Sequence, residues 1–477
     1  MARQAPARPR RISLYRTPTQ DLRTLVTLLE LAGWRKARSV YKTRYPMKDE
    51  SFWLDDGELS DLAFPPAEGR IEADVAIIGA GITGLSAACH LKARFPELTV
   101  VVLERERVGS GASGRSSGAL TDIPERTWAY KLARDGVEET HRAAAFQRSG
   151  VETVLSLIRE GEIDCDLGSP GYLMLGLNRH VPHLRREAEA MQRLGRQGRF
   201  LNRDEVKGFV QQDFYEAGVY APAYWLNPGR YVRGLARLAQ RRGVRIFERS
   251  AVEGMRPGRP TRLRLNGGGD VRAETVLLAT NGYTPRLGFF RHRIFPVHTC
   301  AVATEELSPA ELSSLGWQGR EVIFEAAQVG HTFYLTPDDR LVCRGTLHYQ
   351  FNDGVRPFDL TEVEARLTEA IQHRFPQLKP VRISHRWSGV LGMTRWFYPA
   401  IGRLESKGDI LHGVGYSGHG IAYATLAGRL VTEMYAGEVS PELTYSLEHA
   451  VPPLMPPEPF RYMGFHGLIR WWQWREG

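Results

Sequence analysis

The sequence predicts an α/β domain interleaved with a second domain that is built mainly on an antiparallel β-sheet. Three observations lead to this fold class. Residues 74–104 read as a strand, a glycine-rich turn, a helix and a second strand. The segments 165–225 and 294–395 break into short alternating strands, and strand–turn patterns return near 275–282 and 410–420. A chain of 477 residues is also long enough for two cores.

The first βαβ unit carries the strongest motif. A buried strand, 75–78, runs into the sequence GAGITG at 79–84, and a helix and a second strand, 99–103, follow. A G-x-G-x-x-G sequence is weak evidence alone, but between a strand and a helix it predicts a Rossmann-like dinucleotide site. Free N–H groups at the start of that helix then face the phosphates.

Each glycine of this motif has a physical reason. Gly79 permits the tight turn out of the strand, Gly81 lets the backbone approach a pyrophosphate, and Gly84 lets the helix pack on the sheet. Glu104 ends the second strand, twenty positions beyond Gly84 (104 − 84). There a carboxylate accepts hydrogen bonds from ribose hydroxyls and repels a 2′-phosphate; the alternative is a solvated residue at a strand end.

The stretch 108–118, VGSGASGRSSG, is too rich in glycine for a regular element. Its hydroxyls, its N–H groups and Arg115 suit a pyrophosphate and the edge of a planar ring of the cofactor, and a flexible surface loop is the alternative. Helical spacing resumes at 135–160 and again at 229–242.

The second half of the chain reads as further strands and turns. A buried strand over 275–282 ends in a tight turn, and 333–343 reads as a hairpin opened by Pro337. A helix over 361–374 interrupts the strands. Finally a strand at 410–415, a loop and a helix at 421–435 follow, and Gly437 stops that helix. His419 in this loop either senses ligand charge or is an ordinary loop histidine.

Composition excludes several classes. The net charge is +9, and much of the excess lies in an arginine-rich tail before Asp21, which reads as disordered or as a transit peptide. A leucine-rich amphipathic helix is expected at 20–44. The sequence shows no run of apolar residues long enough to span a membrane and no cluster of basic and aromatic residues for nucleic acid. The four scattered cysteines predict neither a metal site nor disulfides, and favour a reducing, cytoplasmic location.

Four segments together resemble a known family. They are DVAIIGAGITGLSAA, GSGASGRSSG, LLATNGYTP and GVGYSGHGI, and they match in order and spacing over roughly residues 70–440. The chain thus resembles the FAD-dependent amine and amino-acid oxidoreductases, which include D-amino-acid oxidase, glycine oxidase and sarcosine oxidase. The sequence GASGR, the segment Trp387-Ser388-Gly389 and the sequence GYSGHG are most similar to the γ-glutamylputrescine oxidase-like branch.

The resemblance implies a division into domains. An N-terminal tail and lead-in helix occupies 1–69, and a C-terminal aromatic tail occupies 441–477. The FAD-binding domain is expected in three pieces, 70–164, 226–293 and 396–440, and the substrate domain in two, 165–225 and 294–395.

The resemblance also implies the contacts to FAD. The backbone of Val252 is expected beside the adenine. The full set of expected cofactor-binding residues is Gly79, Gly81, Ile82, Thr83, Gly84, Glu104, Arg105, Ser110, Ser113, Gly114, Arg115, Ser117, Val252, Thr280, Asn281, Gly389, Gly415, Ser417, Gly418, His419, Gly420 and Ile421. Relatives with covalent flavin carry a cysteine or histidine that this chain lacks at the matching positions, so we expect FAD to be held non-covalently. Many relatives have Asn-Gly where this chain has Ser116-Ser117-Gly118, which leaves the local flavin contacts open.

The reaction implied is hydride transfer to the flavin from the carbon that bears the nitrogen, and the imine is then hydrolysed. The expected catalytic residues are His348, Tyr334, Trp387 and His419. A group that deprotonates the amine is needed, and further candidates for it are Glu325, His331, Tyr349 and His298. Any one of these residues also has an ordinary structural interpretation.

The substrate and the electron acceptor stay open. Arg344 and Arg386 are candidates to pair a carboxylate, but neither lies in a motif, which favours an amine over an α-amino acid. The acceptor is O₂ or another compound, because the hairpin lacks the lysine with which sarcosine oxidase-like relatives activate oxygen. The alternatives are a flavoprotein dehydrogenase, a hydroxylase, and a nucleotide-binding protein without turnover.

The C-terminal segment 452–474 is rich in proline and then in aromatic residues, and Arg461, Arg470 and Arg475 lie in it or directly after it. It packs on the protein's own surface or makes peripheral contact with an anionic membrane. The sequence does not predict an oligomeric state.

Overall fold

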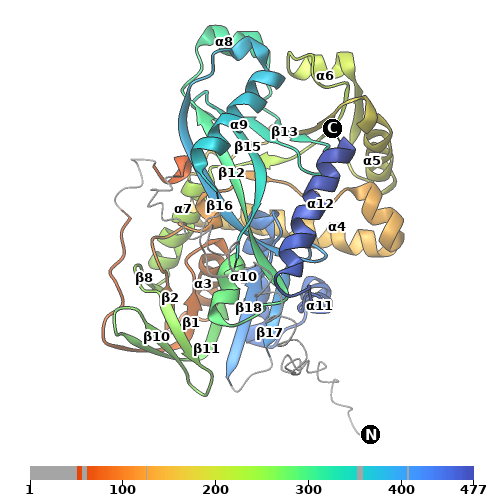
Figure 1. Ribbon diagram of the computed structural model, residues 1–477. Helices are drawn as coiled ribbons and strands as arrows, with labels where there is room; N and C mark the ends of the chain where they lie inside the picture. Colours follow the sequence, from red (N-terminus) through yellow and green to blue (C-terminus); the bar gives the residue numbers. More distant parts are fainter. Residues whose placement is uncertain (1–50, 56–61, 125, 352–357, 405–407, 477) are drawn as a thin grey trace, which may run out of the picture.

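The computed structural model describes residues 51–476 except 56–61, 125, 352–357 and 405–407. Two β-sheets, each covered by helices, make up this part of the chain, and the polypeptide crosses between them several times (Figure 1). The helix expected at 20–44 lies outside the described residues.

The first sheet is mostly parallel. Its strand order is β17-β18-β11-β1-β2-β8, and β9 and β10 extend β11 as an antiparallel ribbon. All neighbours in the main path run parallel except β17 and β18. The strands are β1 (Arg70–Ile78), β2 (Val100–Leu103), β8 (Arg245–Phe247), β9 (Val252–Arg256), β10 (Thr261–Leu265), β11 (Asp270–Leu278), β17 (Ala400–Leu404) and β18 (Asp409–Val414).

The centre of this sheet is apolar on both faces. Val75 lies opposite Val100 on one side and Thr275 on the other, and the run Val75–Ile78 is buried throughout. Such continuous apolar strands are typical of a parallel sheet covered on both faces. The glycine-rich turn therefore leaves the carboxyl end of the central strand.

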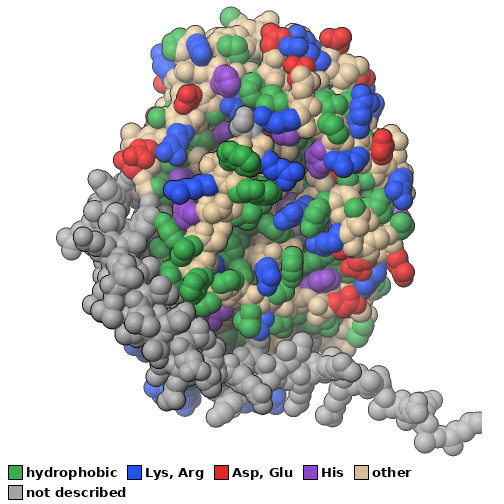
Figure 2. Space-filling model, turned by 45° about the vertical axis from the view of Figure 1, so that its right-hand side comes forward, with side chains coloured by type: hydrophobic (Ala, Val, Ile, Leu, Met, Phe, Trp, Pro, Cys, Tyr) green, Lys and Arg blue, Asp and Glu red, His purple; other side chains and the backbone are tan. Residues whose placement is uncertain are grey.

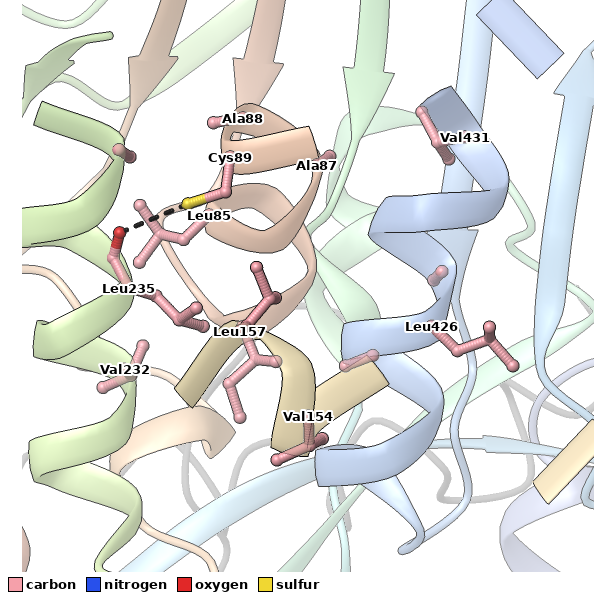
Figure 3. Packing of buried hydrophobic residues seen from close by; sticks show 14 of the residues in the cluster. Leu85, Ala87, Ala88, Cys89, Val154, Leu157, Val232, Leu235, Leu426 and Val431 are labelled. Atoms are coloured by element: carbon pink, nitrogen blue, oxygen red, sulfur yellow. Dashed lines mark hydrogen bonds between the residues drawn. The ribbon is translucent and has the colours of Figure 1, made fainter. Parts of the chain in front are cut away.

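Four helices supply most of the packing around this sheet: α3 (Ile82–Arg94), α4 (Trp128–Gly161), α7 (Pro228–Arg241) and α10 (Gly420–Ala436). Figure 3 shows their apolar side chains in one cluster, where the Cys89 thiol lies 3.5 Å from the Leu235 carbonyl oxygen. The closest approach is between α3 and α10, because a Cβ at Gly428 would lie 2.4 Å from the Ala87 nitrogen. Gly437 ends α10 in the left-handed conformation, as predicted.

The second sheet has the strand order β16-β12-β15-β14-β13-β4-β6-β5. Its neighbours pair antiparallel except β13 and β4, which run parallel. The strands are β4 (Tyr172–Gly176), β5 (Arg199–Asn202), β6 (Ala217–Ala221), β12 (Ile294–Thr304), β13 (Val322–Glu325), β14 (Thr332–Leu335), β15 (Leu341–Tyr349) and β16 (Ile383–Thr394). The expected hairpin with Pro337 in its turn joins β14 to β15.

Smaller elements complete the second half of the fold. The helices near the second sheet are α5 (Val181–Arg193), α6 (Arg203–Phe209), α8 (Pro309–Leu315) and α9 (Leu360–Arg374), and the C-terminal helices are α11 (Pro441–Glu448) and α12 (Phe460–Glu476). A two-stranded ribbon pairs β3 (Ala119–Leu120) with β7 (Tyr224–Trp225). The 3₁₀ turns are η2 (Phe52–Leu54), η4 (Ala112–Gly114), η5 (Asn178–His180), η6 (Asn281–Leu287) and η7 (Pro376–Leu378).

The turn η2 and helix α4 each show one further feature. Trp53 in η2 is buried and its ring lies against Trp225, Tyr334 and Trp387. Helix α4 carries a kink at Gly136, whose φ of 79° breaks the helical geometry. None of the helices in the described part of the chain is long and apolar enough to cross a membrane.

Candidate active site

A cavity of about 1400 Å³ lies between the two sheets. Its lining includes Ile78 and Leu103 of the first sheet, and Met174, Phe324 and Arg344 of the second. Sites for one small ligand usually measure about 300–1,000 Å³. The cavity is therefore large enough for a long ligand and a second molecule.

At one end of the cavity the glycine-rich turn meets the loop before η4. Gly81 is the residue before α3, and the Ile82 N–H donates to Ser113 Oγ over 2.9 Å. A Cβ at Gly81 would lie 2.8 Å from the same oxygen. A side chain here would therefore close the space in front of the helix N-terminus, where an anion is stabilised.

Glu104 is held at the carboxyl end of β2. Its Oε2 accepts from the Ala80 N–H and its Oε1 from the Glu106 N–H, both over 2.9 Å. Burial raises the pKa of Glu104, and these two hydrogen bonds oppose that rise. The carboxylate is thus fixed against the glycine turn and lines the cavity.

A basic cluster that the sequence did not reveal lies beside Glu104. The guanidinium carbons of Arg105 and Arg286 lie 5.1 and 5.0 Å from the centre of the Tyr283 ring. Burial raises the pKa of Tyr283, and the two guanidinium charges lower it. All three side chains line the cavity, as does Val252 of β9, so this end offers positive charge and an aromatic face.

The loop 108–118 is docked on β16 rather than free at the surface. Arg115 Nε donates to the Ser110 carbonyl over 2.9 Å, and Arg115 Nη1 donates to the Ser388 carbonyl over 3.2 Å. A Cβ at Gly389 would lie 3.2 Å from the Arg115 Cβ. Because of this close approach, the loop lies along the wall of the cavity.

The loop GYSGHG closes the cavity from the other side. The Gly415 N–H donates to Asn281 Oδ1 over 2.9 Å, and Ser417 Oγ accepts from the Thr394 N–H over 3.1 Å. These contacts join the ends of β11, β16 and β18. His419 precedes α10 and lines the cavity.

The structure brings most of the expected cofactor residues to one cavity. Those that line it are Gly79, Gly81, Ile82, Thr83, Glu104, Arg105, Ser110, Ser113, Arg115, Ser117, Val252, Thr280, Asn281, Gly389, Ser417, Gly418, His419, Gly420 and Ile421. Gly84, Gly114 and Gly415 stand behind the lining. Gly84 has a packing role, because a Cβ there would lie 2.1 Å from the Gly79 carbonyl oxygen.

Three of the expected catalytic residues lie outside the cavity lining, and that expectation needs correction. Tyr334 is buried against Trp53. His348 stacks on Phe358 with ring centres 4.1 Å apart. Trp387 is buried and its Nε1 donates to the Arg115 carbonyl over 3.1 Å. Their spacing along strands places these side chains on packed faces, and His419 alone of the four lines the cavity.

The end of the cavity at the second sheet is marked by Arg344 of β15. Its Nη2 donates to Thr332 Oγ1 over 2.7 Å. Among the described residues no carboxylate pairs with this guanidinium, and burial lowers the pKa of Arg344. Arg386, the other arginine considered for a carboxylate, forms an ion pair with Glu364 and lies outside the lining.

Glu325 also lines this end but is fully engaged. Its Oε1 accepts from Tyr215 OH and Arg374 Nε, both over 2.9 Å. Its Oε2 accepts from the His331 N–H over 2.8 Å and lies 2.9 Å from His331 Nδ1. Burial alone would raise the pKa of Glu325, but His331 and Arg374 together lower it to about 2. The group is therefore a fixed negative charge.

Sequence reasoning missed two parts of the wall. Arg126 just before α4 and Tyr130 in its first turn form one part, and Phe465 and Trp472 of α12 form the other. No motif marks either segment, and the aromatic spacing in 460–474 is the one signal that α12 offers.

Comparison with known proteins decides which cofactor this cavity suits. The family model described as FAD-dependent oxidoreductase (DAO) matches residues 74–434. The chain belongs to the FAD-dependent oxidoreductase family. The predicted resemblance and the expected FAD cofactor are confirmed.

This oxidoreductase is similar to several known proteins. It is 32% identical over 385 residues to the γ-glutamylputrescine oxidoreductase of Escherichia coli K12, covering 79% of this chain and 86% of that one. It is 32% identical over 400 residues to the probable oxidoreductase OrdL of Haemophilus influenzae, covering 80% and 87%. The names of such relatives agree with the predicted oxidation of an amine or amino acid at its C–N bond.

Solved structures share the fold. Glycine oxidase of Geobacillus kaustophilus superposes with a TM-score of 0.64 at 21% identity, covering 78% of this chain and 96% of that one. L-proline dehydrogenase of P. horikoshii gives 0.65 at 20% identity, covering 80% and 100%. At these identities the likeness concerns the fold alone.

The residues of the cavity suit FAD. The start of α3 offers N–H groups to a pyrophosphate, and Glu104 offers a carboxylate to ribose hydroxyls. When bound, FAD supplies the hydride acceptor. The protein's own groups orient the cofactor and the substrate.

Proposed function

We propose that this oxidoreductase oxidises the C–N bond of an amine or amino acid that carries a carboxylate, and that Arg344 binds this carboxylate. The observation behind the proposal is a half-buried guanidinium in the cavity wall with a neutral hydroxyl, Thr332 Oγ1, as its side-chain partner among the described residues. The sequence alone favours a simple amine, because neither Arg344 nor Arg386 lies in a motif. The position of Arg344 in the cavity wall favours a substrate with a carboxylate instead.

The energetics support an anionic ligand at Arg344. A charge taken out of water costs several kcal/mol unless an opposite charge and hydrogen bonds compensate it. Arg344 has five N–H donors and stays protonated in proteins. A carboxylate fits this fork with two parallel hydrogen bonds.

The wall around Arg344 limits the rest of the substrate. Phe324, Leu347 and Trp472 line the cavity and give it apolar surface. The ionised Glu325 adds a negative charge on the same wall. The combination suits a zwitterionic molecule with an apolar body.

We also propose roles for the cofactor residues and for one base. FAD lies non-covalently along the glycine turn, the loop 108–118 and the loop GYSGHG, with the residues expected from the sequence as its contacts. His298 of β12 lines the cavity and is the group that we assign to accept the proton of the substrate amine.

The test uses paired substrates. Purified holoenzyme is mixed without oxygen with amino acids and with the matching amides and decarboxylated amines, and flavin bleaching is followed. We expect the carboxylates to bleach the flavin at lower concentration than their partners. Arg344→Met should raise the half-saturating concentration about 10- to 100-fold, the effect of losing a hydrogen bond to a charged group.

Arg386→Met is the matched control, because this arginine lies outside the cavity lining. Equal bleaching by acid and amine, or an Arg344→Met variant that behaves as the control, would contradict the role of Arg344. Bleaching by no substrate would favour a nucleotide-binding protein without turnover. Peroxide release on readmitting air then separates an oxidase from a dehydrogenase.

A further inference from the structure

Helix α12 carries apolar side chains on two opposite faces. Phe465, Ile469 and Trp472 are spaced by four and three residues, lie on one face and line the cavity. A second stripe on the other face is exposed and consists of Phe460, Met463, Trp471 and Trp474. Trp474 is 80% exposed and Met463 is 62% exposed. A helix that is apolar on all sides is normally covered on all sides.

The exposed stripe is not part of a loose chain end. Arg461 in the first turn is buried, and its guanidinium pairs with Glu458 over 2.7 Å. It also donates to Tyr349 OH over 2.7 Å and to the Arg291 carbonyl over 3.1 Å. The helix is therefore fixed to β15 of the second sheet at its first turn.

Two further exposed apolar side chains, Trp396 and Leu468, belong to the cavity wall or lie beside it. Trp396 shares a small pocket with Arg126 and Tyr130, which also line the cavity. Leu468 both lines the cavity and is exposed. We call the exposed set the aromatic rim: Trp396, Leu454, Phe460, Met463, Leu468, Trp471 and Trp474. It holds more than half of the large exposed apolar side chains in the described part of the chain.

The charge around the aromatic rim is positive. Arg395, Arg470 and Arg475 flank it, and the sequence between Pro459 and Arg475 contains no acidic residue. The guanidinium carbon of Arg475 lies 5.2 Å from the centre of the Trp471 ring. Figure 2 shows hydrophobic and basic side chains together over the middle of one face, with most acidic side chains towards its edges.

We propose that the aromatic rim seats this oxidoreductase on the surface of an anionic lipid bilayer. Tryptophan is enriched at the headgroup level, and arginine is attracted to anionic lipid. Soluble monomers rarely leave an apolar patch of this kind bare. Leu468 both lines the cavity and is exposed, so this seating would bring one edge of the cavity wall to the lipid surface.

The test is sedimentation of the full-length holoenzyme with vesicles of phosphatidylcholine alone or mixed with phosphatidylglycerol. We expect binding to the anionic vesicles that weakens with salt. Arg470→Gln/Arg475→Gln should lower the partition coefficient about 30-fold, from about fivefold for each arginine near an anionic surface. Trp471→Ser/Trp474→Ser should lower it about tenfold or more.

Val137→Ser/Val439→Ser is the matched control, since both valines are exposed and neither belongs to the aromatic rim. Flavin absorbance checks that each variant is folded, and no turnover is required. The proposal is overturned by absence of sedimentation with anionic vesicles, or by equal sedimentation of the tryptophan variant and the control. The proposal is also overturned if vesicle binding requires deletion of residues 1–50, because the aromatic rim would then be covered by this chain. It is equally overturned if the tryptophan variant abolishes a dimer, because a second copy would then cover the rim.

Discussion

The two ends of the cavity are built in different ways. The centre of the nucleotide end comes from one short stretch, 79–84, through its backbone groups and its lack of side chains. The substrate end collects side chains from β12, β13, β15, α4 and α12, so residues as far apart in the chain as Tyr130 and Trp472 line the same cavity. A site made of backbone is encoded by local spacing, whereas a site made of side chains depends on tertiary assembly.

The largest effect is expected from a substitution at the nucleotide end that abolishes the binding of FAD. In Gly84→Ala the new Cβ would lie 2.1 Å from the Gly79 carbonyl oxygen, so α3 must move away from β1. We expect protein that no longer retains FAD, measured as flavin absorbance per polypeptide after gel filtration. Gly267→Ala is the control, because no atom lies within 4 Å of its Cβ. Flavin retained in Gly84→Ala at the level of the control would contradict the packing role.

The next effect breaks the substrate end. Glu325→Gln leaves the buried Arg374 without its counter-charge, and removing one partner of a buried ion pair costs about 3–5 kcal/mol. The free energy of unfolding in urea measures this loss. Glu364→Gln breaks the ion pair between Glu364 and Arg386, which is more exposed than the pair between Glu325 and Arg374. This change should therefore cost about 1 kcal/mol or less.

Glu325 also gives a pH test of the same cluster. Its pKa in the folded protein, about 2, is below its ordinary value of 4.5. It therefore stabilises the fold above pH 4.5, and this contribution is lost as the pH falls from 4.5 towards 2. In Glu325→Gln the fall of the melting temperature over that window should be shallower; an unchanged slope would contradict the shift.

A smaller effect sharpens the comparison at the nucleotide end. Glu104→Gln replaces the carboxylate that two backbone N–H groups hold in place, and that is proposed to bind the ribose hydroxyls of FAD, with a neutral amide. Hydrogen bonds to charged groups contribute about 1.5–3 kcal/mol, so we expect the Kd for FAD to rise about 10- to 100-fold with the fold intact. Reconstitution of the apoprotein, followed by quenching of FAD fluorescence, measures it. A Kd equal to that of the parent would contradict the role of Glu104.

The smallest effect concerns Trp387. In Trp387→Phe the hydrogen bond to the Arg115 carbonyl is lost, which should cost about 1 kcal/mol of stability. Because Trp387 lies outside the cavity lining, the rate of flavin bleaching should change by less than about twofold. A large loss of rate at normal stability would restore Trp387 as a catalytic residue.

The sequence predicts the nucleotide end well because its signals are local. The spacing of Gly79, Gly81 and Gly84 and the position of Glu104 follow from one βαβ unit, and the structure places them together. Helices α7, α9 and α10 begin and end within a residue of the predicted bounds, since apolar periodicity and the stop at Gly437 define them.

The substrate end resisted prediction for a physical reason. Tyrosine and histidine are residue types that often take part in catalysis. Here the alternation along the strands points Tyr334 and His348 to faces where they pack against Trp53 and Phe358. Arg344 and Arg386 differ in their partners: Thr332 of β14 offers a hydroxyl to Arg344, whereas Glu364 of α9 offers a carboxylate to Arg386. These contacts follow from packing between separate segments of the chain. The same holds for α12, whose contacts lie more than a hundred residues away in the chain.

The interleaving of the two sheets has a consequence for synthesis on the ribosome. Arg70 of β1 pairs with Asp270 of β11, two hundred residues later (270 − 70). The strand β18, which pairs with the other edge of β11, ends only at Val414. At about 5–20 residues per second, β1 waits about 10–40 s for its neighbour. For that interval an apolar strand emerges with one edge unpaired, so the nascent chain of this oxidoreductase depends on chaperones more than the stability of its finished fold suggests.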